Sequence, residues 1–394
     1  MNRKQITLKP GKDQSIRRFH PWVFSGAIAR MSDFPASGEM VDVFSHENRH
    51  LGTGHYSEGS IAVRLFAFGT HTIDEAFWFD KLEKAYRLRE KLGLTNSTET
   101  TIYRLVHAEG DGLPGLIIDI YGSTAVFQAH ATGMHQLREV FTSGLKKLYG
   151  DRLKRVYDKS DLKLSRQSES PSTDGYLFGE AGDAVSKEHG HSFSIDWETG
   201  QKTGFFIDQR ENRKLLGEYS KGKKVLNTFC YTGGFSVYAL AQGAHLVHSL
   251  DSSQKALDLT EEIVQLNGFN DERHAVIKAD AVEYLKKITE DYDVIVLDPP
   301  AFAKHLSARH KAVQGYRKIN EAAMRQIKSG GILFTFSCSQ AVDKTTFLGA
   351  VTAAAIDAGR QIRILHQLHQ PGDHPISIFH PEGEYLKGLV LEVL

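Results

Sequence analysis

The second half of this 394-residue chain alternates strand-like and helical segments, and this alternation constrains the fold more than any other feature. From about Phe205 onward, short apolar runs are separated by longer segments with helical apolar spacing. The apolar runs are KVLNTF, LVHSLD, AVIKAD, DVIVLD, ILFTFS, IRILHQL and YLKGLVLEVL. Such alternation predicts a largely parallel sheet that is covered by helices on both faces. Ligands bind sheets of this kind at the carboxyl ends of the strands, near a topological switch point.

The residues before this region have a different pattern. The first seventy or so contain the strand-like segments GEMVDVFS, HLGTGHYS and IAVRLFAF, and no long helix precedes Ile73. The helical segment IDEAFWFDKLEKAYRLREKLGL follows, and strand-like runs and a second helical segment come after it. The sequence therefore predicts three domains: a small β domain at 1–72, a small α+β domain at 73–190, and an α/β domain at 191–394.

The charge is balanced overall but not locally. The formal net charge is zero, so bulk charge indicates no partner. Residues 1–30 contain seven lysines and arginines against one acid, and residues 301–330 contain the same numbers; seven minus one is a net charge of +6 in each. A charge run is usually a solvated face, but two of them favour a phosphate backbone as partner.

The cysteine and apolar content limits the cellular compartments and the kinds of site that we expect. Two cysteines argue against a disulfide framework or a zinc site, and the spacing of the 19 histidines predicts no metal site. No stretch approaches the roughly 20 apolar residues of a membrane span, and no apolar signal segment follows MNRKQITLKP. We therefore expect a cytoplasmic protein without a metal and without membrane association.

Small and polar residues follow five successive strand-like runs of the α/β region. In chain order these are Gly233, Asp251, Asp280, Asp298 and Cys338. Acids at successive strand ends suit a ligand with a ribose and an exocyclic amine. A dinucleotide site needs G-x-G-x-x-G around the first turn, and TFCYTGGFS lacks that spacing. The pattern favours S-adenosylmethionine, which has an adenosine and no phosphate, although a glycine pair alone usually shapes only a turn.

Motifs along nearly the whole chain resemble those of one family. They are IRRFHPWVFSGAI, LGTGHYSEGSIAVRLF, YRLVHAEGDGLPGLIIDIYG, GQKTGFFIDQRENR, FCYTGGFSVYA, LDPPAF, SCS and EYLKG. In this order they resemble the ribosomal RNA large subunit methyltransferase I family, PUA-domain enzymes that methylate carbon 5 of cytosine. The resemblance implies an N-terminal PUA-like RNA-binding domain and a C-terminal Rossmann-like class I methyltransferase domain. It also implies large-subunit ribosomal RNA as partner.

The resemblance places the cofactor between the segment QKTGFFIDQR and the strand ends. The residues it assigns to S-adenosylmethionine are Thr203, Phe206, Asp208, Arg210, Phe229, Tyr231, Gly233, Asp251, Asp280 and Asp298. Two of them have plainer explanations that stay open: Phe206 as a core aromatic and Arg210 as the partner of a helix-surface acid. Asp208 and Glu211 also have the spacing of a capping box for the helix DQRENRKLLGEYS.

The presence of Cys338 determines which methylation reaction we assign to the segment DVIVLDPPAF. An Asp-Pro-Pro-aromatic turn also occurs in enzymes that methylate exocyclic amines, and those need no thiol. Carbon 5 of cytosine is a poor nucleophile, and addition of a thiolate to carbon 6 makes it enamine-like. We interpret Cys338 as this nucleophile and Asp298 as the group that holds the cytosine amine and ring nitrogen. The residues expected at the substrate are Pro299, Phe302, Lys304, Arg17 and Arg18.

Several alternatives stay open on the sequence alone. Cys338 has the alternative of being a small buried hydrophobe, and Cys230 is interpreted as pocket lining. The first alternative function is methylation of a guanine, at ring nitrogen 7 or the exocyclic amine, which does not need Cys338. The second is a non-catalytic RNA-binding or ribosome-assembly factor that has kept the fold. His374 is expected to anchor a loop, and assembly as a homodimer also stays open.

Overall fold

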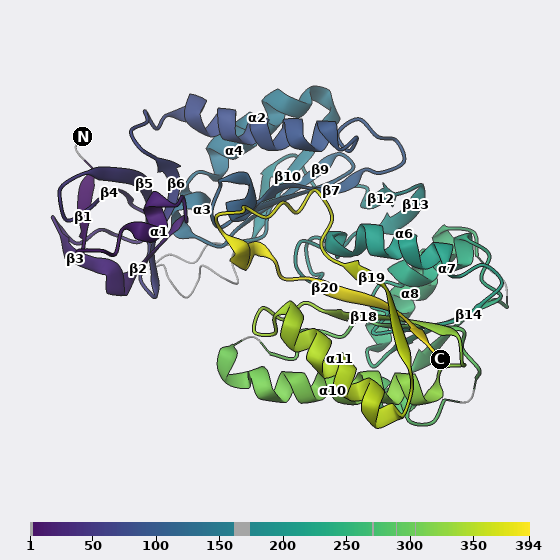
Figure 1. The fold of residues 1–394 in the computed structure, drawn as a ribbon. Helices are drawn as coiled ribbons and strands as arrows, with labels where there is room; N and C mark the ends of the chain where they lie inside the picture. The colour runs from purple at the N-terminus through teal and green to yellow at the C-terminus, as the bar shows by residue number, and fades with distance from the viewer. Residues whose placement is uncertain (1–2, 161–173, 270–271, 289, 304) are drawn as a thin grey trace. The chain divides into compact units, whose positions relative to one another are not determined.

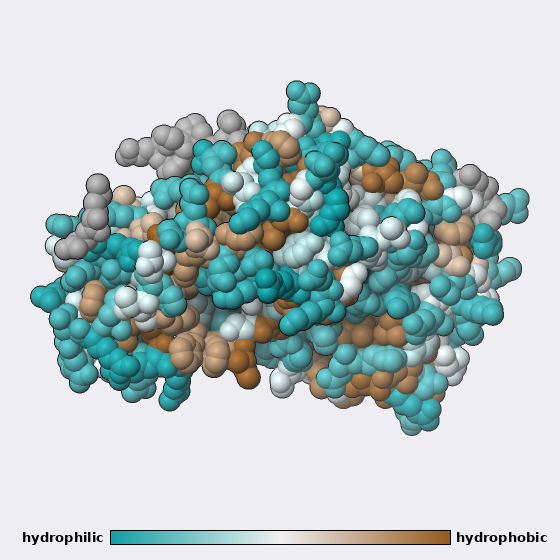
Figure 2. Space-filling view, turned by 90° about the horizontal axis from the view of Figure 1, so that it is seen from above, coloured by the Kyte–Doolittle hydropathy of each residue, from teal (hydrophilic) through white to brown (hydrophobic). Residues whose placement is uncertain are grey.

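The computed structural model describes residues 3–160, 174–269, 272–288, 290–303 and 305–394 (Figure 1). The chain forms two compact units. The first consists of Met1–Glu188, Ser194–Ile207 and Gly372–Gly383, and the second of His189–Phe193, Asp208–Pro371 and Glu384–Leu394. Hydrophilic residues cover most of the face in Figure 2, with apolar residues scattered among them. No helix in the described part of the chain combines the length and the apolarity that crossing a bilayer requires.

The N-terminal part of the first unit is a six-stranded sheet with the order β2-β6-β5-β4-β1-β3. Its elements are β1 (Lys4–Leu8), α1 (Gln14–Arg17), β2 (Trp22–Phe24), β3 (Ile28–Met31), β4 (Met40–Phe44), β5 (His50–Tyr56) and β6 (Ile61–Phe68). Strands β4, β5 and β6 coincide with the three strand-like segments predicted from the sequence. The core of this sheet includes Ile6, Val43 and Leu65, all of which are buried.

A second, five-stranded sheet of the first unit has the order β11-β10-β9-β8-β7. Its elements are α2 (Glu75–Lys91), β7 (Ile102–His107), β8 (Leu116–Tyr121), β9 (Thr124–Ala129), α3 (Thr132–Gln136), α4 (Arg138–Tyr149), β10 (Arg155–Asp158) and β11 (Gly175–Phe178). Helix α2 begins where the Asp74 carboxylate accepts a hydrogen bond from the Phe77 amide at 2.9 Å. Strands β12 (Val185–Glu188) and β13 (His191–Ser194) follow.

The second unit contains a seven-stranded sheet with the order β16-β15-β14-β17-β18-β20-β19. Its strands are β14 (Lys224–Thr228), β15 (Leu246–Asp251), β16 (His274–Lys278), β17 (Val294–Leu297), β18 (Gly331–Ser337), β19 (Ile362–Leu368) and β20 (Lys387–Val393). The first five pair in parallel, as the alternating sequence predicts. Only β20 runs the other way, between β18 and β19. The strand order reverses beside β14, which is the switch point of the sheet.

Helices cover both faces of this sheet. They are α6 (Arg210–Glu218), α7 (Gly234–Ala241), α8 (Gln254–Leu266), α9 (Ala281–Leu285), α10 (Arg309–Gln326) and α11 (Lys344–Ala358). Figure 1 shows α10 and α11 on one face and α6 and α7 on the other. The capping box expected at Asp208 and Glu211 is wrong: the N-cap of α6 is Gln209, and it makes no side-chain cap. A 3-10 turn, η4 (Ile207–Gln209), leads into the helix and moves its start past Asp208.

Candidate active site

The ends of β17 and β18 place Asp298 and Cys338 at one edge of the sheet. The two strands pair in parallel, with Leu297 opposite Thr335. Asp298 is the first residue after β17, and Cys338 is the first residue after β18. Both side chains are half-buried, so each keeps a path to solvent. The topology therefore brings the two residues to neighbouring strand ends, as the sequence pattern predicted.

The turn after Asp298 is held by ring packing. Pro299 is buried, and Phe302 packs on Tyr316 of α10 with ring centroids 4.8 Å apart. The absence of a side chain at Gly315 leaves room for the Phe302 ring, because a β-carbon there would lie only 3.0 Å from it. Phe302 is thus held against α10 directly after the turn. Lys304 lies outside the described residues.

Lys387, the first residue of β20, lies near the end of β18. Its ammonium donates hydrogen bonds of 2.7 Å to the backbone carbonyls of Ser339 and Tyr385. Burial lowers the pKa of Lys387 to about 8, and its interaction with Cys338 works in the opposite direction. A cation that interacts with the Cys338 sulfur favours the thiolate over the thiol. Lys387 is therefore a candidate for activating this cysteine.

The loop between β14 and α7 has an unusual backbone. Phe229 and Tyr231 have positive φ angles of 56° and 48°, in the region that non-glycine residues rarely adopt. Gly233 follows with φ of 71°, and a β-carbon there would lie 2.6 Å from Cγ2 of Thr260. Strained backbone of this kind is concentrated at ligand sites. The geometry suits a loop whose backbone approaches a ligand closely.

The acids at the ends of β15 and β16 have structural partners. Asp251 accepts hydrogen bonds from the amides of Tyr231 at 3.2 Å and Ser253 at 2.9 Å. A carboxylate has about four lone-pair sites, so Asp251 keeps acceptor capacity for a ribose diol. Asp280 caps α9 by accepting from the Glu283 amide at 3.0 Å. The residues of this loop and strand edge thus fit the adenosine part of S-adenosylmethionine.

Cys230 differs from Cys338 in its surroundings. Its side chain is buried, and burial raises its pKa to about 12. The sulfur lies 3.6 Å from the hydroxyl of Thr260. A thiol in this state is a poor nucleophile at neutral pH. This geometry fits the interpretation of Cys230 as pocket lining.

The four expected cofactor residues from 203 to 210 have the following contacts. Thr203, in the first unit, donates to the Asp119 carboxylate at 2.6 Å, and Phe206 lies under the Lys202 ammonium at 4.2 Å. Asp208, in the second unit, accepts from the Tyr385 hydroxyl at 2.8 Å. Arg210 is buried, and its guanidinium donates a hydrogen bond to the Glu211 carboxylate at 2.9 Å. It therefore has the helix-surface acid as a partner, which was the alternative left open by the sequence.

Both basic runs contain arginines that are paired with acids in the structure. Arg17 and Arg18 are exposed, although Arg17 bonds Asp13 at 2.6 Å. In the second run, Arg309 pairs with Asp343 at 2.8 Å and Arg317 pairs with Asp357 at 2.5 Å. Both acids belong to the α11 region and are absent from the count over 301–330. These two acids offset two of the six net positive charges of the second run.

Comparison with known proteins places the chain in a family. A model of the S-adenosylmethionine-dependent methyltransferases matches residues 157–378, and a PUA-like domain model matches residues 6–68. Proteins named ribosomal RNA large subunit methyltransferase I from Alteromonas mediterranea and Shewanella amazonensis are 41% and 40% identical to it, over 99% of this chain and 98% and 99% of theirs. The chain belongs to the ribosomal RNA large subunit methyltransferase I family.

This membership confirms the resemblance predicted from the motifs. The chain is an S-adenosylmethionine-dependent methyltransferase with a PUA-like domain at its N-terminus. A solved structure of a candidate methyltransferase from Streptococcus mutans shares the fold, with a TM-score of 0.85 and 21% identity over the full length of both chains. A second solved structure, of a candidate methyltransferase complexed with SAH, also covers the full length of both chains, with a TM-score of 0.86. The Rossmann-like fold predicted for the C-terminal part is therefore confirmed.

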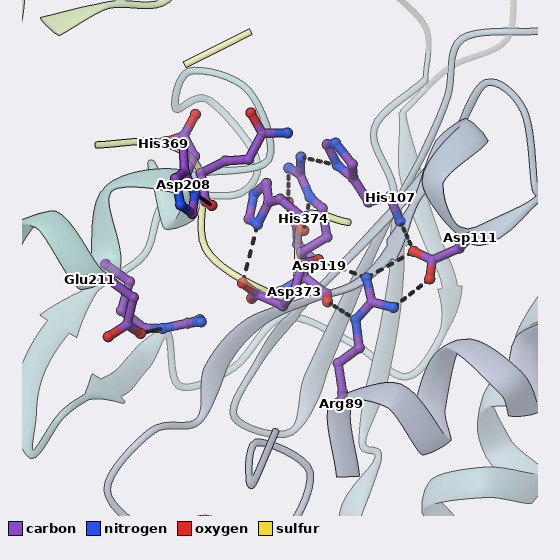
Figure 3. A network of polar contacts seen from close by, with 12 residues as sticks. Arg89, His107, Asp111, Asp119, Asp208, Glu211, His369, Asp373 and His374 are labelled. Atoms are coloured by element: carbon purple, nitrogen blue, oxygen red, sulfur yellow. Dashed lines mark hydrogen bonds and ion pairs between the residues drawn. The ribbon is translucent and has the colours of Figure 1, made fainter. Parts of the chain in front are cut away.

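This member of the methyltransferase I family also has a buried ionic network that the sequence did not lead us to expect (Figure 3). Arg89 of α2 donates to both carboxylate oxygens of Asp111, at 2.5 and 2.8 Å, and to the Asp373 carbonyl at 2.7 Å. Asp373 also contacts the buried ring of His374 at 3.2 Å. His374 thus belongs to a loop anchor, the role expected for it. A signal existed: Arg89 continues the buried stripe of α2 formed by Trp78, Leu82 and Ala85.

Proposed function

We propose that the protein transfers a methyl group from S-adenosylmethionine to carbon 5 of a cytosine in large-subunit ribosomal RNA, through a covalent adduct with Cys338. The observation that carries the proposal is the placement of Asp298 and Cys338 at the ends of adjacent parallel strands, beside the switch point of the sheet. The names of the relatives support ribosomal RNA as the substrate. The two free cysteines fit a reaction in the cytoplasm.

The proposed reaction begins with the thiolate of Cys338. Its attack on carbon 6 forms a carbon–sulfur bond and moves electron density to carbon 5. S-adenosylmethionine supplies the methyl group as an electrophile on its sulfonium sulfur. Asp298 accepts a hydrogen bond from the exocyclic amine and holds the ring against the Pro299 turn. Loss of the carbon-5 proton to a base then breaks the carbon–sulfur bond and restores Cys338.

Lys387 supports the first step. Its charged form favours the Cys338 thiolate, and with a pKa of about 8 it is mostly protonated at neutral pH. We expect Lys387→Met to move the rising limb of the pH–rate profile to higher pH, while Lys387→Arg keeps a permanent charge and restores it in part. A Lys387→Met profile identical to that of the wild type would remove Lys387 from the mechanism.

The RNA surface is proposed to include the exposed Arg17 and Arg18 of the PUA-like domain. Neutralised phosphates release counterions, so affinity is expected to fall with salt at a log–log slope near −0.7 per phosphate on single-stranded RNA. Arg17→Ala combined with Arg18→Ala should reduce this slope and leave affinity for S-adenosylmethionine unchanged. An unchanged slope would show that RNA binds elsewhere.

The direct test is mass spectrometry of nucleosides after methyl transfer to large-subunit ribosomal RNA from cells that lack the protein. We expect 5-methylcytidine with the wild type, none with Cys338→Ala, and continued formation with Cys230→Ala. Binding of S-adenosylmethionine by Cys338→Ala should stay within a few-fold of the wild type. A methylated guanosine in place of 5-methylcytidine would replace the proposal by the guanine alternative. Cofactor binding without any methyl transfer would favour the assembly-factor alternative.

A further inference from the structure

Three potential metal ligands meet in the first unit, and none of them is among the residues assigned to the candidate active site. His20 lies between α1 and β2, while His380 and Glu382 lie at the 3-10 turn η6 (Pro381–Gly383). One ligand atom from each of the three lies within 4.8 Å of the other two, and no other such group of three occurs in the described residues. His20 and Glu382 are 362 positions apart. Sequence spacing therefore carries no sign of the cluster, and the expectation of no metal site rested on that spacing.

His380 is the unusual member of the cluster. Its side chain is only 4% exposed, and neither ring nitrogen has a hydrogen-bond partner among the described residues. Buried polar groups are nearly always satisfied, and leaving one unsatisfied costs about 1–3 kcal/mol. The indole of Trp22 packs edge-on against the ring at 4.4 Å between centroids and fixes its position. A buried, positioned imidazole without a hydrogen bond is a group that still needs a partner.

The other two groups face His380 with suitable chemistry. The two carboxylate oxygens of Glu382 lie 3.4 Å from Nε2 of His20 and 3.8 Å from Nε2 of His380. Burial works to raise the pKa of Glu382, but a backbone hydrogen bond and the His20 ring hold it below its ordinary value. Burial lowers the pKa of His380, which favours the neutral ring. An ionised carboxylate and a neutral imidazole are the forms that bind metals.

We propose that His20, His380 and Glu382 form a binding site for a borderline transition-metal cation of the Zn²⁺ class. Tetrahedral zinc, with bonds of about 2.0–2.2 Å, separates its ligand atoms by about 3.3–3.5 Å, which matches the 3.4 Å contact between Glu382 and His20. The three ligand atoms lie within 4.8 Å of one another, so the metal draws the remaining pairs closer together. Two imidazoles and one carboxylate suit zinc better than Mg²⁺ or Ca²⁺, which prefer oxygen ligands. Glu382 is half-exposed, so water can complete the fourth position.

Binding has a local consequence at His20. Its Nδ1 accepts a hydrogen bond from the Trp22 amide at 3.2 Å, so coordination through Nε2 requires the proton to move to Nδ1 and this bond to be lost. In return the metal fastens the segment Gly372–Gly383 to the PUA-like sheet. The proposed function does not depend on this site, and the site does not depend on that function.

The test uses the full-length chain after treatment with a chelator, with Zn²⁺ and Co²⁺ alone as probes. We expect one Zn²⁺ per chain, a rise in the temperature of unfolding, and visible absorption from bound Co²⁺. His380→Phe should abolish all three, yet its metal-free form should be no less stable than the wild type because two unsatisfied nitrogens are gone. Glu382→Gln, at a half-exposed position, should fold normally and bind at least about tenfold more weakly.

Two controls separate this site from other metal ligands. His46→Ala removes an exposed imidazole, and Cys338→Ala removes the more accessible thiol. Both variants should bind Zn²⁺ as the wild type does. The proposal is overturned if the wild type binds no Zn²⁺, or if His380→Phe and Glu382→Gln retain its stoichiometry and affinity.

Discussion

His55 should make the first unit sensitive to acid. The ring is buried between Phe66, at 4.7 Å, and Trp78, at 5.9 Å in a stacked geometry. Gly133 permits this packing, because a β-carbon there would lie 2.2 Å from the ring. Burial lowers the pKa of His55 to about 3. Its charged form is therefore confined almost entirely to the unfolded chain between pH 6.5 and 3.

The size of the effect follows from proton linkage. Between these pH values the unfolded chain binds more protons, so stability is complete above pH 6.5 and falls as the pH falls. With pKa values of about 6.5 unfolded and about 3 folded, the loss between pH 8 and pH 5 is about 2 kcal/mol.

The assay is urea unfolding followed by tryptophan fluorescence at pH 8 and pH 5. Trp22, Trp78 and Trp197 all belong to the first unit, so the signal reports on that unit. The wild type should lose about 2 kcal/mol more between the two pH values than His55→Leu does. His46→Ala, at an exposed position, should behave as the wild type. Equal losses in the wild type and His55→Leu would refute the reasoning.

Two further substitutions test other parts of the structure. Asp111→Asn leaves the fully buried guanidinium of Arg89 without its carboxylate partner and should destabilise the first unit by about 3–5 kcal/mol in urea unfolding. Asp80→Asn removes one partner of an exposed ion pair and should cost less than about 1 kcal/mol. Gly233→Ala combines a left-handed backbone with a clash against a neighbouring side chain and should weaken binding of S-adenosylmethionine at least about tenfold by calorimetry. Gly243→Ala has a similar backbone angle with open space, and should leave that affinity unchanged. Equal losses of stability in Asp111→Asn and Asp80→Asn would contradict the first argument. Equal affinities of Gly233→Ala and Gly243→Ala for S-adenosylmethionine would contradict the second.

The parallel part of the sheet was predictable because its signals are local. DVIVLD becomes β17, whose four residues are all buried, and the two prolines after Asp298 end it. The same logic placed Gly233 after β14 and Cys338 after β18. Motifs of neighbouring residues therefore predicted which residues follow these strands at this edge of the sheet. The reversed direction of β20 was not predictable, because it depends on pairing with β18 and β19.

The parts that could not be predicted arise from contacts between distant residues. Lys387 meets the end of β18 only through the register of β20, 48 positions from its partner Ser339. Arg317 is neutralised by Asp357, which a count over residues 301–330 omits. His20 and Glu382 likewise meet only in the folded chain, because 362 positions separate them in the sequence. Single-sequence patterns describe periodicity along one element, and they carry no information on which side chains meet across the fold.

The most direct test of the proposed function is covalent trapping on RNA that carries 5-fluorocytidine. Fluorine at carbon 5 blocks proton loss after methylation, so the carbon–sulfur bond to Cys338 should persist. In the presence of S-adenosylmethionine, we expect an RNA–protein adduct that survives a denaturing gel with the wild type and with Cys230→Ala, and none with Cys338→Ala. Near-normal methylation of ordinary RNA by Cys338→Ala, with no adduct from the wild type, would contradict the account.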